Sequence, residues 1–347
     1  MQNNNTPKQS KSLFYFIELI CVIISVVAFS VNVYKLFGNK PFNLTPPPAA
    51  PVVQSQPPSA FSVHSDQSKT SPDTSESTKA NIAVTGGQNH AVALKKDGTV
   101  QISGVDDATR NIVQQWSDII QISAGQYYTV ALTEYGTVYA AGNNEHGQCD
   151  TYGWSDIVQV SAGYTHTVAL RKDGTVVAVG DNEHGQCNTQ HLRNVVDVSA
   201  GKYHTAVLYS DGTVDTVGDP GKDDYGQCNV YEWSNIKDIE ASGYRTVGLT
   251  TNGTVLSTGS NINHQCDTEA WHNIKMVGAA WGHSVALKSD GTLTAIGYGD
   301  SGRTNVSNFK NIVYVDADFE CTYLIDKDGY VHILGQNASH ASTFNNF

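Results

Sequence analysis

A phrase of about 38 residues recurs from residue 79 to the end of the chain, and this repeat limits the folds that the chain can adopt. One turn glycine marks each copy, and the series is Gly98, Gly136, Gly174, Gly212, Gly253, Gly291 and Gly329. Successive glycines are 38 residues apart, except for one step of 41 caused by three extra residues within 218–228. A second glycine follows six residues later in every copy. The chain therefore contains seven copies of one structural unit.

The third copy, residues 154–191, shows what each unit should form. Its segments IVQVSA, HTVALR and TVVAVG alternate apolar and polar residues, which is typical of short β-strands. Asp173-Gly174 lies between the last two segments and predicts a hairpin turn. One small sheet cannot bury both of its faces, so such units must stack on one another. The repeat therefore predicts an all-β fold, a seven-bladed β-propeller.

The ends of the repeat region predict how the ring of blades closes. A large apolar residue opens six of the units, and the series is Trp116, Trp154, Leu192, Trp233, Trp271 and Phe309. The first unit has Thr78 at this position, and the next member of the series is Phe347, the last residue. We therefore expect the C-terminus to supply the missing aromatic residue to the first blade.

The first 79 residues differ from the repeats. Residues 13–33 are predominantly apolar with one charged residue, Glu18, and as a helix they would span about 31 Å, enough to cross a hydrocarbon core. No clean small-residue cleavage site follows them, and the large Leu19 and Ile20 before Cys21 do not fit a lipoprotein signal. These features predict an uncleaved signal-anchor, a single transmembrane helix.

Residues 38–79 are rich in proline, serine and threonine and poor in large apolar residues. Such a segment cannot bury enough surface to offset the entropy of ordering it, so we expect a disordered linker that acts as a stalk. The predicted domains are a short N-terminal tail at 1–12, the membrane helix at 13–37, the stalk at 38–79 and the propeller at 80–347. Slightly more positive charge precedes the apolar run than follows it, which favours a propeller outside the cytoplasm.

The repeat region is acidic. The whole chain has a net charge of −12, and residues 1–79 hold more lysines than acids, so the excess of acids lies in the repeats. This charge repels phosphate backbones and argues against nucleic-acid binding. Four cysteines follow a glutamine in successive copies, at Cys149, Cys187, Cys228 and Cys266. Equivalent positions of neighbouring blades lie too far apart for disulfides, so we expect free thiols.

These phrases resemble the regulator of chromosome condensation repeat family, over residues 79–347. The matching motifs are GYTHT at 163–167, GKYHT at 201–205, the Asp-Gly-Thr-Val turn, and Gly-Gln-Cys at 147–149, 185–187 and 226–228. The spacing is similar to that of compact microbial repeats. The last two copies lack Gly-Gln-Cys, as does the first. The resemblance implies a seven-bladed propeller that binds proteins through one face, but members differ widely in function, from nucleotide exchange factor to photoreceptor and β-lactamase inhibitor.

Two sets of polar residues suggest metal sites. Three residues after a loop glycine the copies read His90, Tyr128, His166, His204, Arg245, His283 and Cys321. Equivalent positions are carried apart around the axis, whereas zinc needs its ligands within about 2.1 Å. We therefore interpret these histidines as structural, each hydrogen-bonded inside its own blade. Asp219, Asp223 and Asp224 do not match a known calcium loop. We predict no metal and no cofactor.

Aromatic residues follow the same loop glycine in six copies. They are Tyr127, Tyr164, Tyr203, Tyr244, Trp281 and Phe319. All lie in the loop that joins two strands of a blade, so they should share one face of the disc, and such residues form the hot spots of protein interfaces. The alternative is that each ring packs on a neighbouring blade, since Gly243 and Gly282 leave room for Tyr244 and Trp281 to turn inward. We predict a partner-binding face.

No catalytic motif is found, whether a nucleophile elbow, a phosphate-binding glycine loop or a His-Glu-x-x-His helix. The sequence therefore predicts a monomeric binding module rather than an enzyme, anchored in the membrane through residues 13–37, that captures a protein partner. A glycan-binding or cell-wall-binding module is an alternative, since it would stack sugar rings on the same aromatic residues. A guanine-nucleotide exchange factor would instead need a cytosolic propeller and a small GTPase.

Overall fold

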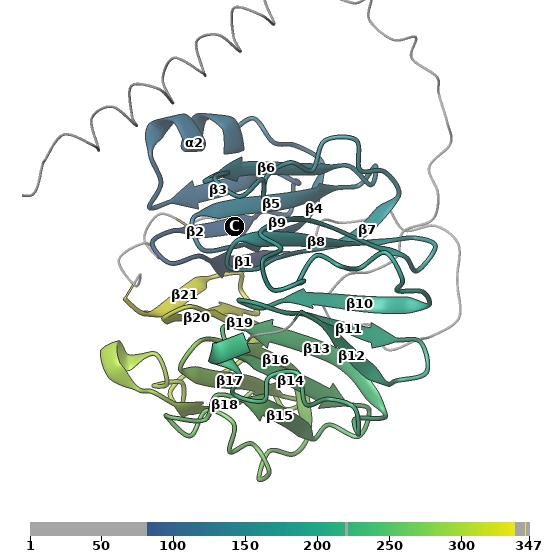
Figure 1. The fold of residues 1–347 in the computed structure, drawn as a ribbon. Coiled ribbons are helices and arrows are strands. Elements are labelled where there is room, and N and C mark those ends of the chain that lie inside the picture. The colour runs from purple at the N-terminus through teal and green to yellow at the C-terminus, as the bar shows by residue number, and fades with distance from the viewer. Residues whose placement is uncertain (1–81, 219–220, 337–343, 345–347) are drawn as a thin grey trace, which may run out of the picture. The chain divides into compact units, whose positions relative to one another are not determined.

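The computed structural model describes residues 82–218, 221–336 and 344. In these residues the strands form seven antiparallel sheets of three, and each sheet is one blade (Figure 1). The blades comprise β1 (Ala83–Gly86), β2 (Ala91–Leu94), β3 (Val100–Ser103); β4 (Ile119–Ala124), β5 (Tyr128–Thr133), β6 (Val138–Gly142); β7 (Ile157–Ala162), β8 (His166–Arg171), β9 (Val176–Gly180); β10 (Val195–Ala200), β11 (Thr205–Tyr209), β12 (Val214–Val217); β13 (Ile236–Ser242), β14 (Arg245–Thr250), β15 (Val255–Gly259); β16 (Ile274–Ala279), β17 (His283–Lys288), β18 (Leu293–Gly297); and β19 (Ile312–Asp318), β20 (Cys321–Asp326), β21 (Val331–Gly335). The predicted all-β, seven-bladed propeller is confirmed.

The third blade forms from the three segments that the sequence predicts. Its hairpin turn places Gly174 at a φ of 78°, a conformation that glycine adopts without steric cost. The amide of Thr175 donates to Asp173 Oδ1 at 2.9 Å, which fixes the turn. The middle strand β8 is buried over almost its whole length, because it contacts the blades on both sides. This is why its apolar character is more continuous than that of an edge strand.

The first strand of each blade is the inner strand, next to the propeller axis. In every blade but the first, a β-bulge near the start of this strand interrupts the alternation of side chains between the two faces of the sheet. In the third blade the register shifts between Ile157 and Gln159. The bulge lets the Gln159 side chain reach the next blade, where its Nε2 donates to Asp197 Oδ1 at 2.6 Å. The Val198 amide in turn donates to Gln159 Oε1 at 3.2 Å. Side chains therefore link inner strands that share no backbone ladder.

The apolar residue that opens each unit packs into a hydrophobic core. Trp116, Leu192 and Trp271 are buried, with Trp116 contacting strands of the first and second blades. The equivalent Trp154, Trp233 and Phe309 are half-buried, and each packs against a separate hydrophobic cluster of the ring. These positions therefore contribute to the hydrophobic cores of the ring.

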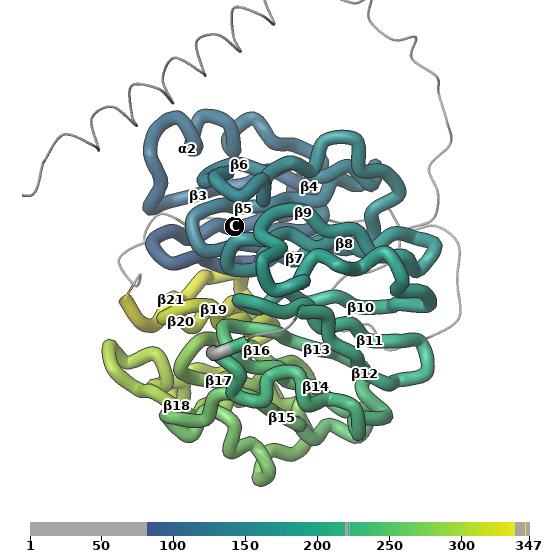
Figure 2. Tube along the Cα trace, viewed as in Figure 1, coloured from purple at the N-terminus to yellow at the C-terminus, as the bar shows by residue number. Residues whose placement is uncertain are grey.

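The first and last blades share a core that closes the ring. Val84 and Ala91 of the first blade pack with Tyr323 and Ile333 of the last, and Phe344 lies among them with 1% of its surface exposed. Figure 2 shows the last blade beside the first. The predicted aromatic residue, Phe347, lies outside the described residues. Phe344 therefore supplies an aromatic side chain from the C-terminal segment to this seam.

In the described part of the chain, three short helices lie between strands, α2 (Asp107–Val113), η1 (Gly221–Asp223) and η2 (Asp300–Gly302). Asp106 caps α2, since its Oδ1 accepts from the Thr109 amide at 2.7 Å. None of the helices among the described residues is long and apolar enough to cross a membrane. The predicted tail, membrane helix and stalk, residues 1–79, lie outside the described residues.

Candidate functional site

Two kinds of loop lie at the same end of every blade. The loop between the first and second strands meets the segment after the third strand because the three strands are antiparallel. Backbone hydrogen bonds join the two, with Asn143 N donating to Tyr127 O and Ser260 N to Tyr244 O, both at 2.9 Å. We call this end the aromatic face. The hairpin turns, such as Asp173-Gly174, form the opposite face.

Aromatic side chains from the third, sixth and seventh blades meet on this face. The Tyr164 ring lies 5.6 Å from the Trp281 ring and 6.3 Å from the Phe319 ring, and Trp281 lies 5.7 Å from Phe319. Tyr244 joins them at 6.3 Å from Trp281, and Tyr203 lies 6.0 Å from Tyr244. We call these five residues the aromatic cluster. Five of the six predicted site residues are therefore brought together, across the propeller axis.

The side chain of Lys202 lies within the aromatic cluster. Its Nζ is 4.6 Å from the ring centroids of Tyr203 and Tyr244, 5.1 Å from that of Tyr164 and 5.6 Å from that of Trp281. Nζ also donates to the Tyr244 hydroxyl at 2.5 Å. Burial opposes the charge, but hydrogen bonds with Tyr244 and Tyr203 outweigh it and raise the pKa of Lys202. The rings thus hold an ammonium ion by cation–π attraction.

The predicted residues differ in exposure. Tyr127 is 45% exposed and Trp281 is 37% exposed, whereas Phe319 is buried. Tyr164, Tyr203 and Tyr244 are half-buried. The rings pack on one another, and Trp281 also packs against Gly243 of the neighbouring blade. Tyr127 lies apart, since it makes none of the ring contacts found among the described residues.

Gly243 explains the inward position of Trp281. A Cβ atom at residue 243 would lie 2.8 Å from Trp281 Cδ1, so only glycine leaves room for the indole here. Its φ of 55° is also in the left-handed region. Gly243 therefore leaves space on the fifth blade, and the Trp281 side chain of the sixth blade fills this space.

Sequence reasoning missed other side chains on this face. Tyr225 contacts Tyr244 at 5.1 Å, and His184 contacts Tyr203 at 4.2 Å between ring centroids. Tyr225 and Tyr298 are 46% and 43% exposed. These two tyrosines occur in segments after the third strand, and no tyrosine recurs at their positions in the other copies, so they gave no periodic signal. Lys202 was missed because it occupies the aromatic position of the repeat in one copy alone.

The repeated histidines link neighbouring blades. His166 Nε2 lies 3.1 Å from Thr205 Oγ1, and this hydroxyl donates to Gln186 O at 2.9 Å. His166 and Gln186 belong to the third blade and Thr205 to the fourth. Because the hydroxyl proton is used on the carbonyl, Nε2 must carry the imidazole proton. His90, His204 and His283 likewise contact threonines of the following blade.

The histidines are therefore structural, as predicted, but the prediction that each bonds inside its own blade is wrong. The stacking of blades places the start of one middle strand beside the next middle strand, which the repeat spacing alone does not reveal. Arg245 serves the same role, donating to Gln265 O, Ser284 Oγ, Ala280 O and His283 O. Among the described residues, no group of three or more His, Cys, Asp or Glu side chains could hold a metal.

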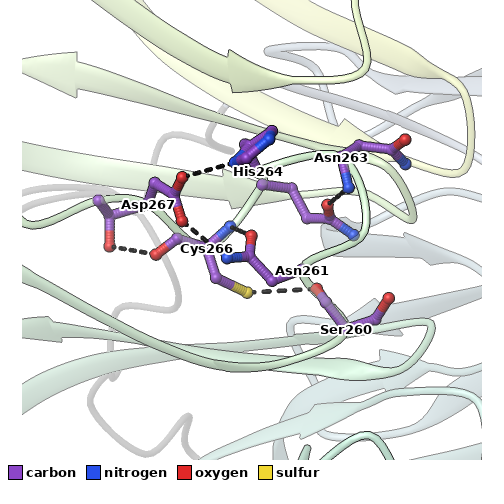
Figure 3. A network of polar contacts seen from close by, with 8 residues as sticks. Ser260, Asn261, Asn263, His264, Cys266 and Asp267 are labelled. Atoms are coloured by element: carbon purple, nitrogen blue, oxygen red, sulfur yellow. Dashed lines mark hydrogen bonds and ion pairs between the residues drawn. The ribbon is translucent and has the colours of Figure 1, made fainter.

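The segments with the Gln-Cys phrase are held by their own polar side chains (Figure 3). In the fifth blade the Cys266 amide donates to Asn261 Oδ1 at 2.8 Å, and Asn261 Nδ2 donates to Asp267 at 2.7 Å. Cys266 Sγ donates to Ser260 O at 3.3 Å. Cys149 and Cys187 form the equivalent bonds. These cysteines and Cys228 are free thiols, as predicted, and the aromatic face is framed by fixed loops.

A cavity of about 1180 Å³ lies inside the ring of inner strands. Tyr164, Lys202, Trp281 and Phe319 line one end of it. Its wall carries Glu240, Asp316 and Asp318. Burial raises the pKa of Asp318 well above its ordinary range, and the charges of Asp316 and Glu240 add to the effect. The aromatic cluster therefore covers an acidic interior.

Comparison with known proteins agrees with this architecture. A family model of the Regulator of chromosome condensation (RCC1) repeat matches residues 119–148, 157–186, 195–227 and 236–265, in the second to fifth blades. Four of the seven blades are therefore built on regulator of chromosome condensation repeats. No curated protein sequence matches this chain.

Solved structures share the fold of this repeat protein. Prp20p from Saccharomyces cerevisiae is 18% identical, with a TM-score of 0.56 over 76% of this chain and 84% of Prp20p. The CRINKLY WD40 ectodomain of the Arabidopsis thaliana receptor kinase ACR4 is 19% identical, with a TM-score of 0.58 over 74% of this chain and 97% of that one. The ectodomain of the Physcomitrella patens receptor kinase CR4 is 18% identical, with a TM-score of 0.60 over 73% of each chain. At these identities the likeness shows the fold alone.

Proposed function

We propose that this repeat propeller is a binding module rather than an enzyme, and that it captures a partner protein on its aromatic face. The aromatic cluster carries this proposal. Trp281 is 37% exposed at the centre of rings that hold one another in place, and such pre-ordered aromatic side chains lose little entropy on binding. Tyr127, Tyr225 and Tyr298 add exposed aromatic surface on the same face.

Proteins of this fold provide a second line of support. The structure of Prp20p was described together with its binding to Gsp1p and histones. Yeast RCC1 (Prp20) has also been crystallised bound to Kap60. A binding role for this chain is therefore in keeping with its fold, although the partners of those proteins are not assigned to it.

We also propose that residues 13–37 anchor the protein in a membrane in a single pass and that residues 38–79 hold the propeller outside the cytoplasm. The apolar run and the composition of the stalk support this. Protease treatment of intact cells is the test. Digestion of the propeller without lysis is the expected result, whereas protection until lysis would place the propeller in the cytoplasm and favour an exchange factor.

Substitution of Trp281 tests the binding face. In the full-length protein, Trp281→Ala should weaken partner capture by at least about 2 kcal/mol, or about thirtyfold, because it removes the central exposed ring. Tyr135→Ala is the matched control, since Tyr135 is 71% exposed on the opposite face. Capture and the melting temperature should be measured on both variants. Equal loss in both would contradict the assignment of the aromatic face, and capture of cell-wall polysaccharide in place of protein would favour the glycan-binding alternative.

A further inference from the structure

The two faces of the propeller differ in net charge. Acidic side chains dominate the loops of the aromatic face, and we call them the acidic rim: Asp106, Asp107, Glu145, Asp150, Asp181, Glu183, Asp223, Asp224, Asp267, Asp300 and Glu320. The hairpin and interblade turns of the opposite face also carry acids, but these are balanced there by most of the cations: Lys95, Lys96, Arg171, Lys172, Arg193, Lys288, Lys310 and Lys327. The aromatic face is therefore the more electronegative side of the disc.

The cations of the aromatic face whose side chains are described neutralise only part of the acidic rim. Arg245 is buried, with 0% exposure, and Arg303, with 3% exposure, pairs with Glu320 of the rim at 3.7 Å. Arg110 pairs with its helical neighbour Asp107 at 2.5 Å. Lys202 lies among the aromatic rings. Glu145 and Glu183 are exposed and take part in none of the ion pairs that the described residues form. Their charges are available to a partner.

The aromatic cluster itself already accepts a cation. The Lys202 ammonium lies within 5.6 Å of four ring centroids, so the rings present their electron-rich faces to a positive charge. This observation does not depend on the acidic rim, because it concerns ring geometry at the centre of the face. Lys202 already fills this position, so the acidic rim around the cluster is what attracts a positive charge of the ligand, and the exposed part of Trp281 offers apolar surface next to it.

We propose that the aromatic face recognises a cationic segment of a partner protein. Lysine or arginine side chains of this segment lie against the acidic rim, and an aromatic or aliphatic side chain covers Trp281. The proposal rests on the binding function proposed above and specifies the class of partner. Electrostatic complementarity of this kind also accelerates association and excludes acidic partners.

Two labelled synthetic peptides of equal length test the proposal. Both carry the same tryptophans, and one carries lysines where the other carries glutamates. Fluorescence anisotropy with the full-length protein should show binding of the lysine peptide and at least about tenfold weaker binding of the glutamate peptide. Raising NaCl from about 0.05 M to about 0.5 M should weaken binding of the lysine peptide, because the Debye length falls from roughly 14 Å to roughly 4 Å.

Charge-neutralising variants locate the interaction. Glu145→Gln with Glu183→Gln should weaken binding of the lysine peptide by about tenfold at low salt. Glu134→Gln with Asp328→Asn, which removes two exposed acids of the opposite face, is the control and should leave binding unchanged. Trp281→Ala should also weaken binding, since the segment must reach the aromatic cluster.

The outcomes separate this inference from the proposed function. The inference would be overturned if the double variants of the two faces weakened lysine-peptide binding equally. It would also be overturned if Trp281→Ala left this binding unchanged. In both cases the peptide would be attracted by the overall negative charge of the protein and not by the aromatic face. Partner capture that depends on Trp281 but not on Glu145, Glu183 or salt would also overturn it, while leaving the aromatic face as a binding site. Lysine-peptide binding that needs both Trp281 and the acidic rim is the supporting result.

Discussion

Buried imidazoles at the blade interfaces carry their protons on one defined nitrogen. His166, His204 and His283 are each buried, and each Nε2 lies about 3 Å from a threonine hydroxyl of the next blade. Burial lowers the pKa of His166 to about 3, of His204 to about 4 and of His283 to about 3. The neutral form is the one that the fold stabilises, and the hydrogen bond offsets part of the cost of burying a polar ring.

These histidines predict a loss of stability in mild acid. Their pKa values in the folded protein lie below the ordinary value near 6.5, so between about pH 4 and pH 6.5 the unfolded chain binds protons that the folded protein does not. Their contribution is complete above about pH 6.5 and is lost as the pH falls, by up to roughly 1.4 kcal/mol per pH unit for each histidine. Urea unfolding of the full-length protein at about pH 7 and about pH 5 measures this. His204→Gln should reduce the difference in the free energy of unfolding between these two pH values. An unchanged difference would mean that the imidazole of His204 has the same pKa in the folded and unfolded protein.

At the position of the repeated histidine, one interface between blades differs from the other six. From His90 onward, the position that carries histidine faces a hydroxyl of the next blade in six interfaces. At the seam the corresponding residues are Cys321 and Ala91, both apolar and both buried with Phe344. An interface between blades that are distant in sequence is thus sealed by apolar packing, with a side chain from the C-terminal segment filling the space.

Phe344→Ala tests the closure of the ring. Phe344 is 1% exposed, so its truncation leaves a cavity of aromatic size and should lower the free energy of unfolding by about 3–5 kcal/mol. Chain ends normally tolerate change, which makes the expectation specific. Tyr231→Ala, at a side chain that is 82% exposed, is the control and should change the melting temperature little. Similar melting temperatures for the two variants would show that the ring closes without Phe344.

The ring as a whole stacks every blade on two neighbours, so a single blade cannot lose its core without exposing the next. The reactivity of the cysteine thiols can show whether the blades unfold together. Cys187 is buried, and burial raises the pKa of Cys149 and of Cys187 to about 12, with the charge of the adjacent acid adding to each effect. The reactive thiolate is therefore scarce in the folded protein.

Site-resolved alkylation in increasing urea at about pH 8 measures cooperativity. We expect slow labelling of Cys149 and Cys187 in the folded protein, and the same urea midpoint for both and for Cys321 in the last blade, because the blades should unfold together. Mass spectrometry of the digested protein distinguishes the sites. Distinct midpoints for the second and last blades would show that part of the ring opens independently.

The sequence by itself determined the number of blades, the strands of each and the hairpin turns. These features depend on alternation, turn residues and a fixed step, all of which are local in the chain. It also placed the site residues Tyr164, Trp281 and Phe319 in equivalent loops of one face. Spacing along the chain, however, measures the path between residues and not their distance in space.

Only the tertiary structure decided which of these residues meet. Closure of seven blades brings Tyr164 within 5.6 Å of Trp281, although more than a hundred residues separate them, because both loops reach toward the axis. The same stacking carries His166 to Thr205 in the next blade. It also sets Lys202 among four rings, which no repeat pattern marks. The physical reason is that each contact depends on the curvature of the ring and on side-chain packing between blades, and neither is local to one repeat.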